Sequence, residues 1–508
     1  MTGATGKKHR ETSRAAWCRR PRWGGVFVLL LGALMGAAVV PIPTGAQGPS
    51  ATQAPPGHDD RTPGPDANLD RVLDEVGALA PELLSRYIAI DTRNPPGNET
   101  AGARFLSEVL EREGIESQVI ESQPGRGNLY ARLEGTGAKR PVILLSHIDV
   151  VPAEAERWRH DPFAGAIDEG QVWGRGALDC KGIGITELLS VIAIHRAGLR
   201  LDRDVILLAT ADEEMGGRLG AGWMVEHHMD LLGDAEFVLN EGGFIRTAPD
   251  GRLLFDLSVA EKGPCWFRVV AEGTPGHASR PAAETAVTRL VAALDHLVRW
   301  ERPLAVGPVV AGYFAAYATL DEQHARQFRQ LERSLEDPEF RSWFLSKPAN
   351  AALVRDTVTP TVLSGSAKTN IVPAEAMAEV DSRLLPGHRC ADFLDEVRKR
   401  IGSEHVRVEP MSVAFPSSQS GLDNALTKAV EALASKEPSG AVVLPGLLSG
   451  FTDSHYFREH GMAAYGFVPI RVSPEQRETM HGPNERIDAG ELAKGVRRLV
   501  ELLRLVSR

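Results

Sequence analysis

The chain has 508 residues, of which 43% are hydrophobic and 24% charged, with 50 glycines and 33 prolines. This composition is typical of a folded globular protein and argues against collagen, coiled coil or wholesale disorder, while the length predicts about two to three domains. The 67 acidic residues outnumber the 57 basic ones, giving a formal net charge of −10. No nucleic-acid partner is expected, because that binding depends on basic patches. The four cysteines, Cys18, Cys180, Cys265 and Cys390, are too few and too scattered for a disulfide scaffold or a cysteine zinc site.

The N-terminus has the pattern of an export signal over residues 1–46. Basic residues dominate before residue 23, an uncharged apolar run covers 26–40, and small residues end at Ala46. This order predicts a secreted or periplasmic protein with a cleaved signal peptide. The alternative is an uncleaved anchor, the one case in which membrane contact is expected, although the run is shorter than the roughly 20 residues of a spanning helix. Residues 47–69 are rich in proline and are predicted to be a disordered linker.

Residues 70–262 alternate helices and strands. Apolar residues have helical spacing over 69–90, 103–113 and 184–197, and short continuous apolar runs occupy 141–146, 204–211 and 237–240. Continuous apolar runs are typical of strands covered on both faces. The pattern predicts an α/β fold, in which helices cover a mainly parallel sheet and ligands bind beyond the carboxyl ends of its strands.

Residues 263–410 change to the order β-α-β-β-α-β, which is typical of a ferredoxin-like α+β unit. The predicted strands cover 266–272, 361–367, 376–383 and 406–409, and the predicted helices cover 282–300 and 391–401. Residues 301–358 are a largely helical insertion whose aromatic residues are predicted to form core or, alternatively, a hydrophobic entrance. The α/β pattern resumes over 411–508. We therefore predict a catalytic domain interrupted by a smaller lid domain.

Side chains that can bind metal follow the predicted strands and turns. They are His147, Asp149, Asp179, Glu213, Glu214, Glu241 and, far downstream, His481. Each is weak by itself, because a single histidine or an acidic pair is usually structural. Together, imidazole and carboxylate groups suit zinc, with Co²⁺ and Mn²⁺ as alternatives, and two such metals about 3.5–4 Å apart form a hydrolytic site.

These motifs resemble those of the M20 family of metallopeptidases and amidohydrolases. The segments that carry the resemblance are HID at 147–149, GRGALD at 174–179, DEE at 212–214, NEGG at 240–243 and GHAS at 276–279, together with His481. The similarity extends over about residues 70–505. Within the family, WGRGA at 173–177, the run 149–152 and the lid insertion most resemble the carboxypeptidase S and N-acyl-amino-acid hydrolase branch. Cys180 stands where many relatives have a second Asp, which implies altered packing and not a lost ligand.

The resemblance implies two bound Zn²⁺ ions. His147 and Glu241 would bind one metal, Glu214 and His481 would bind the other, and Asp179 would bridge the two.

Two further carboxylates next to these ligands are assigned catalytic roles by the resemblance. Glu213 would be the general base that takes a proton from water and delivers it to the leaving amine. Asp149 would accept a hydrogen bond from the second ring nitrogen of His147 and fix its tautomer. A strand-end cap is the alternative for Asp149.

Three lid residues match functional positions of the family. His277 would contact the tetrahedral oxyanion, in relatives frequently from the partner subunit. Asn370 and Arg383 would line the substrate pocket, with the guanidinium of Arg383 clamping a substrate carboxylate. The alternative is that Asn370 and Arg383 only satisfy backbone groups and sheet charges. The turn at 450–454 resembles a substrate-facing loop of the family, with Ser449 in place of its first glycine.

The expected activity is that of a secreted dinuclear zinc hydrolase that cleaves an amide or peptide bond next to a free amino-acid carboxylate, of the carboxypeptidase or dipeptidase kind. An N-acyl-amino-acid amidohydrolase is the alternative, so the substrate is a small peptide or an N-acyl amino acid. A non-catalytic binding protein on the same scaffold is a third interpretation, against which the intact Glu213 and ligand set argue. A homodimer through the lid is expected from the family, although the insertion could supply the same cover within one chain.

Overall fold

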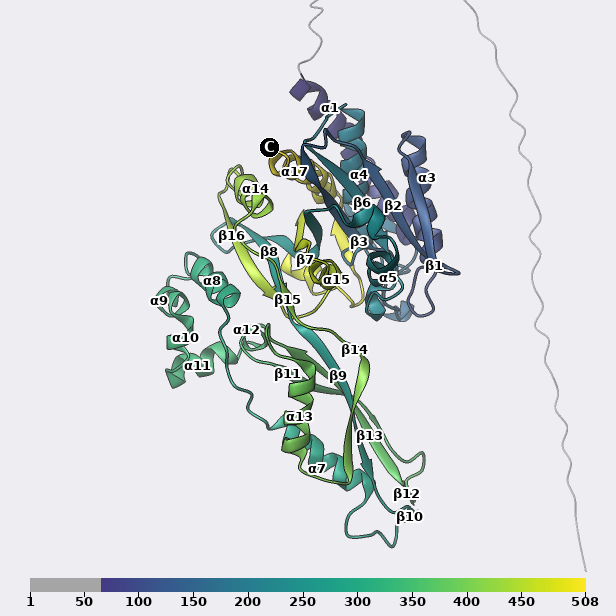
Figure 1. The fold of residues 1–508 in the computed structure, drawn as a ribbon, viewed down its shortest axis with the longest axis vertical. Coiled ribbons are helices and arrows are strands. Elements are labelled where there is room, and N and C mark those ends of the chain that lie inside the picture. Colours follow the sequence, from purple (N-terminus) through teal and green to yellow (C-terminus); the bar gives the residue numbers. More distant parts are fainter. Residues whose placement is uncertain (1–64) are drawn as a thin grey trace, which may run out of the picture. The chain divides into compact units, whose positions relative to one another are not determined.

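The computed structural model describes residues 65–508 (Figure 1). The predicted signal at 1–46 and most of the predicted linker lie outside the described residues. Residues 65–69, predicted to be linker, instead form the start of helix α1 (Pro65–Gly77). Among residues 65–508, no helix is both long and apolar enough to cross a membrane.

The catalytic part is built on a nine-stranded sheet with the order β1-β2-β6-β3-β7-β17-β8-β15, to which β16 adds by pairing with β8. Its centre is parallel, because β6, β3, β7 and β17 run side by side in one direction. The strands are β1 (Ser117–Gln123), β2 (Arg126–Leu133), β3 (Lys139–His147), β6 (Arg203–Thr210), β7 (Phe237–Thr247), β8 (Leu253–Glu261), β15 (Ser418–Gln419), β16 (Ala441–Leu448) and β17 (Ala463–Arg471).

Helices cover both faces of this sheet, as the continuous apolar strands predict (Figure 1). On β3, Val142 and Leu144 belong to one buried cluster, while Ile143 and Leu145 belong to another on the opposite face. The first cluster includes residues of α1, α2 (Ala80–Ile88), α3 (Glu99–Arg112), α4 (Lys181–Arg196), α14 (Ala425–Ala434) and α17 (Ala489–Val506). The second includes residues of α5 (Ala221–His227), α6 (Met229–Leu232) and α15 (Ser454–Glu459).

Small elements connect these layers around the sheet edge that carries the site. They are a three-stranded sheet of β4 (Ala166–Asp168), β5 (Gln171–Trp173) and β18 (Arg486–Asp488), the 3₁₀ turns η1 (Ala155–Arg157) and η2 (Glu213–Met215), and α16 (Pro474–Arg477). Because β18 pairs with β5, the loop after α16 is held next to the loop before α4.

The lid has a four-stranded antiparallel sheet in the order β11-β13-β9-β14. This is the strand order of the predicted ferredoxin-like unit. The elements are β9 (Gly263–Glu272), α7 (Ala286–Val298), β11 (Thr357–Ser364), β13 (Glu375–Leu384), α13 (Cys390–Ile401) and β14 (Val406–Ala414), with a small ribbon of β10 (Gly276–His277) and β12 (Ile371–Val372). The predicted fold class, a helix-covered parallel sheet with an α+β lid, is confirmed.

A disulfide between Cys265 and Cys390 joins β9 to the start of α13. This pairing was not predicted from the sequence, in which the two cysteines are 125 residues apart. Their Cα atoms lie 5.4 Å apart, within the usual range for a disulfide.

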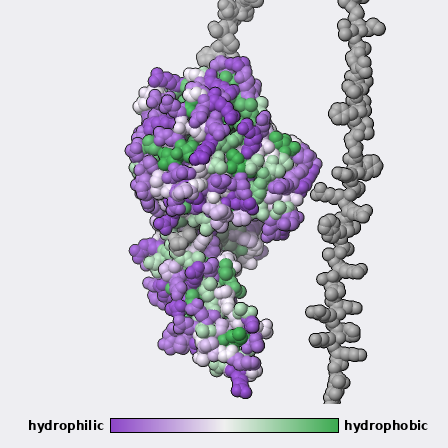
Figure 2. Space-filling model, turned by 90° about the vertical axis from the view of Figure 1, so that its right-hand side faces the viewer, coloured by the Kyte–Doolittle hydropathy of each residue, from purple (hydrophilic) through white to green (hydrophobic). Residues whose placement is uncertain are grey.

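The insertion contains five helices and a core of its own. Phe314, Phe328, Phe340 and Phe344 are buried together, so these aromatic residues form core and not an entrance. The helices are α8 (Pro308–Tyr317), α9 (Ala325–Arg329), α10 (Leu331–Ser334), α11 (Pro338–Leu345) and α12 (Pro348–Leu353). Figure 2 shows one face of the molecule, where hydrophobic residues occur in separate patches among hydrophilic ones.

Candidate metal centre

The five predicted ligands meet at one edge of the central sheet. His147 is the last residue of β3, Glu214 lies in η2 directly after β6, and Glu241 lies on β7. Parallel neighbouring strands end at the same edge, so these three side chains converge. Asp179 precedes α4, and His481 follows α16 in a left-handed backbone conformation with φ 57°.

Asp179 lies between the two imidazoles. Its Oδ1 is 2.9 Å from Nε2 of His147, and its Oδ2 is 3.0 Å from Nε2 of His481. Glu241 Oε1 is 3.7 Å from His147 Nε2, while Glu214 Oε1 is 3.3 Å from His481 Nε2. The cluster therefore has two halves, each with one histidine and one glutamate, that share a single aspartate.

The donor set fits divalent cations. The hydrogen bonds of His481 to Asp179 and then to Glu214 raise the pKa of His481 to about 10. The surrounding carboxylates therefore favour a positive charge between them. Burial, followed by the charge of Asp179, raises the pKa of Glu241 well above its usual range. Buried carboxylates in such proximity are costly unless a cation neutralises them. Nitrogen and oxygen donors of this kind suit zinc, cobalt or manganese.

Glu213 lies beside this cluster without joining it. Among the described residues, its carboxylate has no hydrogen-bond or ion-pair partner. Burial, reinforced by the negative charge of Glu241, raises its pKa well above the usual range. An unpaired carboxylate with a raised pKa at the rim of a metal site has the properties of a proton-transfer group.

Asp149 contacts both halves of the site, but not through the atom that the sequence analysis expected. Its backbone oxygen, at 2.9 Å, accepts from Nδ1 of His147, whereas the carboxylate Oδ1 is 3.5 Å from that nitrogen. The carboxylate instead accepts hydrogen bonds from the backbone N–H groups of Glu213 and Glu214, both at 3.1 Å. Asp149 thus fixes the tautomer of His147 and also holds the turn that presents the two glutamates.

A buried polar network behind this turn was missed by the sequence analysis. Asn94 donates to the carboxylates of Asp149 at 2.9 Å and Asp212 at 3.2 Å. Arg126 lies 2.8 Å from Asp212 Oδ1 and 2.8 Å from Oε2 of the buried Glu99. Asp212 has φ 72°, a strained conformation for a residue other than glycine. Arg126 and Asn94 therefore hold the left-handed residue from which Glu213 and Glu214 project.

Arg175 and Glu485, which were not predicted as site residues, support Asp179 and His481. Glu485, in the same loop as His481, accepts hydrogen bonds from the backbone N–H groups of Leu178 at 2.8 Å and Asp179 at 3.1 Å. Arg175 pairs with Glu485 and donates to the backbone oxygen of Gly482. Both residues could have been suspected from the sequence because they lie close to predicted ligands. Arg175 lies within GRGALD, and Glu485 lies four residues after His481.

The turn at 450–454 is tied to the strand ends next to the ligands. Asn240, the neighbour of Glu241, donates to the hydroxyls of Thr452 and Ser454. The hydroxyl of Thr210, at the end of β6, donates to Asp453 at 3.0 Å. The turn therefore faces the site, as its resemblance implied.

Cys180 packs beneath His147. Its thiol accepts from the backbone N–H of His147 at 3.0 Å, and the Asp179–Cys180 peptide bond is cis. Donor atoms of His147, Cys180 and Glu241 lie within 4.8 Å of one another, as do those of His147, Asp179 and Glu214. Burial raises the pKa of the thiol, so it is a neutral neighbour of the cluster.

The predicted lid residues are not in contact with this cluster. His277 is exposed on β10, where its Nδ1 accepts from the hydroxyl of Ser279 at 2.8 Å, and Asn370 is exposed beside it. In Figure 1, β10 and β12 lie at the end of the lid remote from β3 and β7.

Arg383 lies nearer to the site. It pairs with Asp381 through Nε at 2.7 Å and Nη2 at 2.9 Å. Its guanidinium lies 4.8 Å from the ring centre of Phe451, which belongs to the turn that faces the metal cluster. The pair with Asp381 agrees with the alternative in which Arg383 only satisfies charges on the sheet. The contact with Phe451, however, keeps Arg383 beside the site.

The family model described as "Peptidase family M20/M25/M40" matches residues 143–505. The chain belongs to this family. It is therefore a metallopeptidase or amidohydrolase of the M20 type, as the motifs predicted.

Curated relatives of this M20 chain cover most of its length. It is 27% identical to "Probable carboxypeptidase S-like 2" of Dictyostelium discoideum, over 68% of each chain. It is 26% identical to "N-fatty-acyl-amino acid synthase/hydrolase PM20D1" of Homo sapiens, over 83% of this chain and 86% of the relative. It is 30% identical to "Aminoacylase-1A" of Rattus norvegicus, over 82% and 92%.

Solved structures of similar fold cover nearly the whole M20 chain. The M20 family metallo-carboxypeptidase Sso-CP2 from Sulfolobus solfataricus has a TM-score of 0.67 at 20% identity, covering 84% of this chain and 98% of its own. Human carnosine dipeptidase 1 has a TM-score of 0.63 at 15% identity, covering 87% and 99%. At these identities the likeness establishes the fold.

Proposed function

We propose that this M20 protein is an exported, dinuclear zinc hydrolase that cleaves an amide or peptide bond next to a free amino-acid carboxylate. The observation that carries the proposal is the position of Asp179 between His147 and His481, each with its own glutamate. His147 and Glu241 would hold one metal, Glu214 and His481 the other, with Asp179 shared. When bound, two such cations polarise the scissile carbonyl and make water nucleophilic at neutral pH.

The protein's own residues would perform the proton transfers and the positioning. Glu213 would accept a proton from the attacking water and return it to the nitrogen of the leaving amine. Asp149 would keep Glu213 in place through the backbone N–H at 3.1 Å. Arg383 would meet the substrate carboxylate with the part of its guanidinium that Asp381 leaves free.

The relatives support a second candidate substrate class. Besides a relative named carboxypeptidase S-like, the chain resembles proteins named aminoacylase-1 and N-fatty-acyl-amino acid synthase/hydrolase. Dipeptides and N-acyl amino acids share the amide next to a free carboxylate. The second candidate is therefore an N-acyl-amino-acid amidohydrolase with the same catalytic groups.

Export is supported by the disulfide in the lid. Cys265 and Cys390 form a bond of a kind that persists in oxidising compartments and is rare in the cytosol. Together with the basic and apolar order of residues 1–46, the disulfide supports secretion or a periplasmic location. N-terminal sequencing of the protein recovered outside the cytoplasm would identify the cleavage point.

Dimerisation through the lid is supported by its surface. α7 exposes Val287, Val291 and Val298, and the edge strand β11 exposes Val362 and Leu363. Exposed apolar residues and an open strand edge favour association with a second copy. In such a dimer, the exposed His277 of one copy would contact the substrate in the site of the other copy. Light scattering on the purified protein measures this state, and a monomer would contradict the proposal.

The decisive experiment combines metal analysis with a matched substrate panel. We expect two zinc ions per chain and hydrolysis of dipeptides or N-acyl amino acids, with little cleavage of the same compounds when their carboxylate is amidated. Equal cleavage of the amidated compounds would contradict carboxylate recognition. Metal-loaded protein that cleaves neither class would contradict the proposed function.

A further inference from the structure

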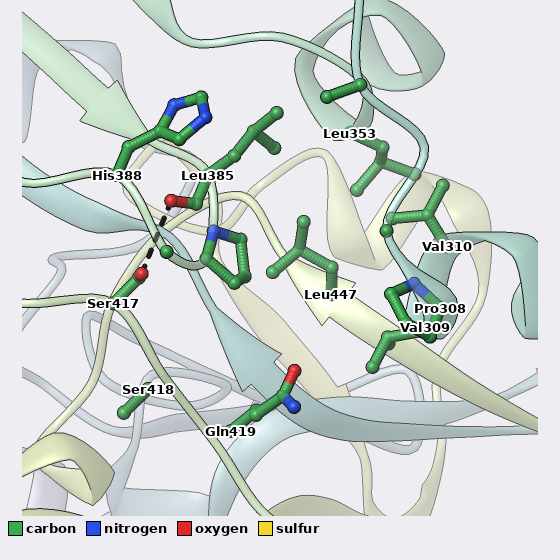
Figure 3. Close-up of a pocket in the computed structure, with 14 residues that line it drawn as sticks. Pro308, Val309, Val310, Leu353, Leu385, His388, Ser417, Ser418, Gln419 and Leu447 are labelled. Carbon is green, nitrogen blue, oxygen red and sulfur yellow. Dashed lines mark hydrogen bonds between the residues drawn. The ribbon is translucent and has the colours of Figure 1, made fainter.

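A cavity of about 470 Å³ lies where the lid, the insertion and the central sheet meet (Figure 3). The insertion contributes Ala305, residues 307–310 and Leu353, and the loop between β13 and α13 contributes residues 385–388. The chain returning from the lid contributes residues 417–419, and β16 contributes Leu447. None of these residues belongs to the metal centre.

The lining selects one class of ligand. Its walls are aliphatic, formed mainly by Val309, Val310, Leu353, Leu385 and Leu447. None of the residues that line the cavity is Lys, Arg, Asp, Glu, Phe, Tyr or Trp. Metal cations would therefore lack an anionic ligand, and flat aromatic rings would lack a stacking surface. The volume lies in the range of small-molecule pockets and is too small for a helix about 10 Å wide.

Polar side chains at two separate places in the lining offer hydrogen bonds. In Figure 3 the amide of Gln419 and the side chain of Leu447 extend into the same space. The Gln419 amide makes no hydrogen bond to any residue of 65–508. The ring of His388 is oriented by Asp356, whose Oδ2 is 2.8 Å from Nδ1. These groups suit a polar head at the end of an apolar chain.

We propose that this cavity binds a free single-chain amphiphile, an aliphatic chain with a carboxylate or hydroxyl head. The chain would lie against Val309, Leu353 and Leu447, and the head would bond to Gln419 or His388. This site is separate from the metal centre, and the ligand is not cleaved there.

The position of the cavity links occupancy to the angle of the lid. The lid joins the sheet through two crossings, Lys262 between β8 and β9 and residues 415–417 between β14 and β15. The crossings pack backbone to backbone, since a Cβ on Gly263 would lie 2.7 Å from the backbone of residues 415 and 417. Lys262 Nζ donates to the backbone oxygens of Ala352 at 3.0 Å and Arg355 at 2.9 Å.

A ligand in the cavity would touch several of these segments at once. It would contact the returning crossing, a lid loop, and the insertion that Lys262 anchors. Leu447 also lies on β16, which leads into the turn at 450–454 that faces the metal centre. Binding is therefore expected to restrict lid movement and change the turnover rate.

The test is calorimetric titration of the full chain with dodecanoate below its micelle concentration. Leu353→Trp fills the cavity, and Leu422→Trp is the matched control because Leu422 is 46% exposed and lies outside the cavity. We expect one bound dodecanoate per chain, binding weaker by about tenfold or more in Leu353→Trp, and no change in Leu422→Trp. Val309→Trp fills the cavity from another segment and keeps the test valid if Leu353→Trp does not fold.

Two further arms separate this site from the alternatives. Binding should survive removal of metal by a chelator, and dodecanoate should alter kcat without raising KM. The proposal would be overturned if dodecanoate bound equally well to both filled variants, or if it competed with substrate. It would also be overturned if the protein bound phosphatidylcholine vesicles through the cavity and did not bind dodecanoate. Because the titration does not use hydrolysis, its result stands whether or not the proposed activity is found.

Discussion

The sheet edge of the catalytic domain and the tip of the lid present their predicted functional residues in opposite ways. At the sheet edge, His147 is buried and Asp179 nearly so, and their hydrogen bonds reach across the chain to His481 and Glu485. At the lid tip, His277 and Asn370 are exposed, and within residues 65–508 they form hydrogen bonds only to neighbouring residues. The metal centre is therefore assembled within one chain, whereas the lid residues depend on closure or on a second copy to reach a substrate.

The largest expected effect tests the base at the sheet edge. Glu213→Gln removes the proton acceptor but leaves all five ligands in place. We expect kcat to fall by roughly 10²–10⁴-fold with unchanged metal content, measured by steady-state kinetics and elemental analysis. Glu226→Gln, on the exposed surface of α5, is the matched control. Turnover at the wild-type level in Glu213→Gln would show that another group moves the proton.

The second prediction tests the lid tip directly. His277→Ala should lower kcat by about 10²–10³-fold if the imidazole stabilises the oxyanion, whereas His405→Ala, elsewhere on the lid, should not. If His277 acts across a dimer, mixing His277→Ala with Glu213→Gln should restore roughly a quarter of wild-type activity, because each mixed dimer has one complete site. Activity that stays at the level of the separate variants would place His277 outside the partner's site.

The network behind the metal centre predicts a smaller loss. Arg126→Met removes the cation between Glu99 and Asp212, which loosens the turn carrying Glu213. We expect kcat to fall about 10–100-fold, with KM and metal content nearly unchanged. Arg132→Met is the matched control, because Arg132 lies on the same strand but pairs with Asp204 and the exposed Asp234. Equal behaviour of the two variants would contradict a positioning role.

The smallest effect on the metal centre is expected from the lid disulfide. The double substitution Cys265→Ser with Cys390→Ser should destabilise the lid by about 2–4 kcal/mol, since the bond closes a long loop. Metal affinity should not change. Hydrogen exchange of β9 and α13 measures the local loss, and a reductant should reproduce it in the wild type but not in the variant. Unchanged exchange in the lid would contradict a stabilising bond.

The sequence alone predicted the strands, the metal ligands and the lid elements, because each depends on a local pattern of residues. Continuous apolar runs at 141–146 and 204–211 predicted buried strands, and the chemistry of the residues that follow predicted a metal centre. The order of lid elements was also predictable, because each helix or strand has its own periodicity. Arg126 and Asn94 escaped prediction because they lie far along the chain from the glutamates that they position. The helical start of α1 was missed because its proline resembles a linker, although proline is well tolerated in a first helical turn.

The sequence by itself determined the fold class, the family and the set of donor side chains, because apolar periodicity and residue chemistry can be recognised within short segments of the chain. Only the tertiary structure decided that Asp179 lies between the two histidines, and that Asp149 holds His147 through its backbone oxygen. It also decided that Cys265 pairs with Cys390 and that a cavity forms beside Leu447. These contacts join residues far apart in the sequence, so they depend on how whole layers pack and not on any local preference.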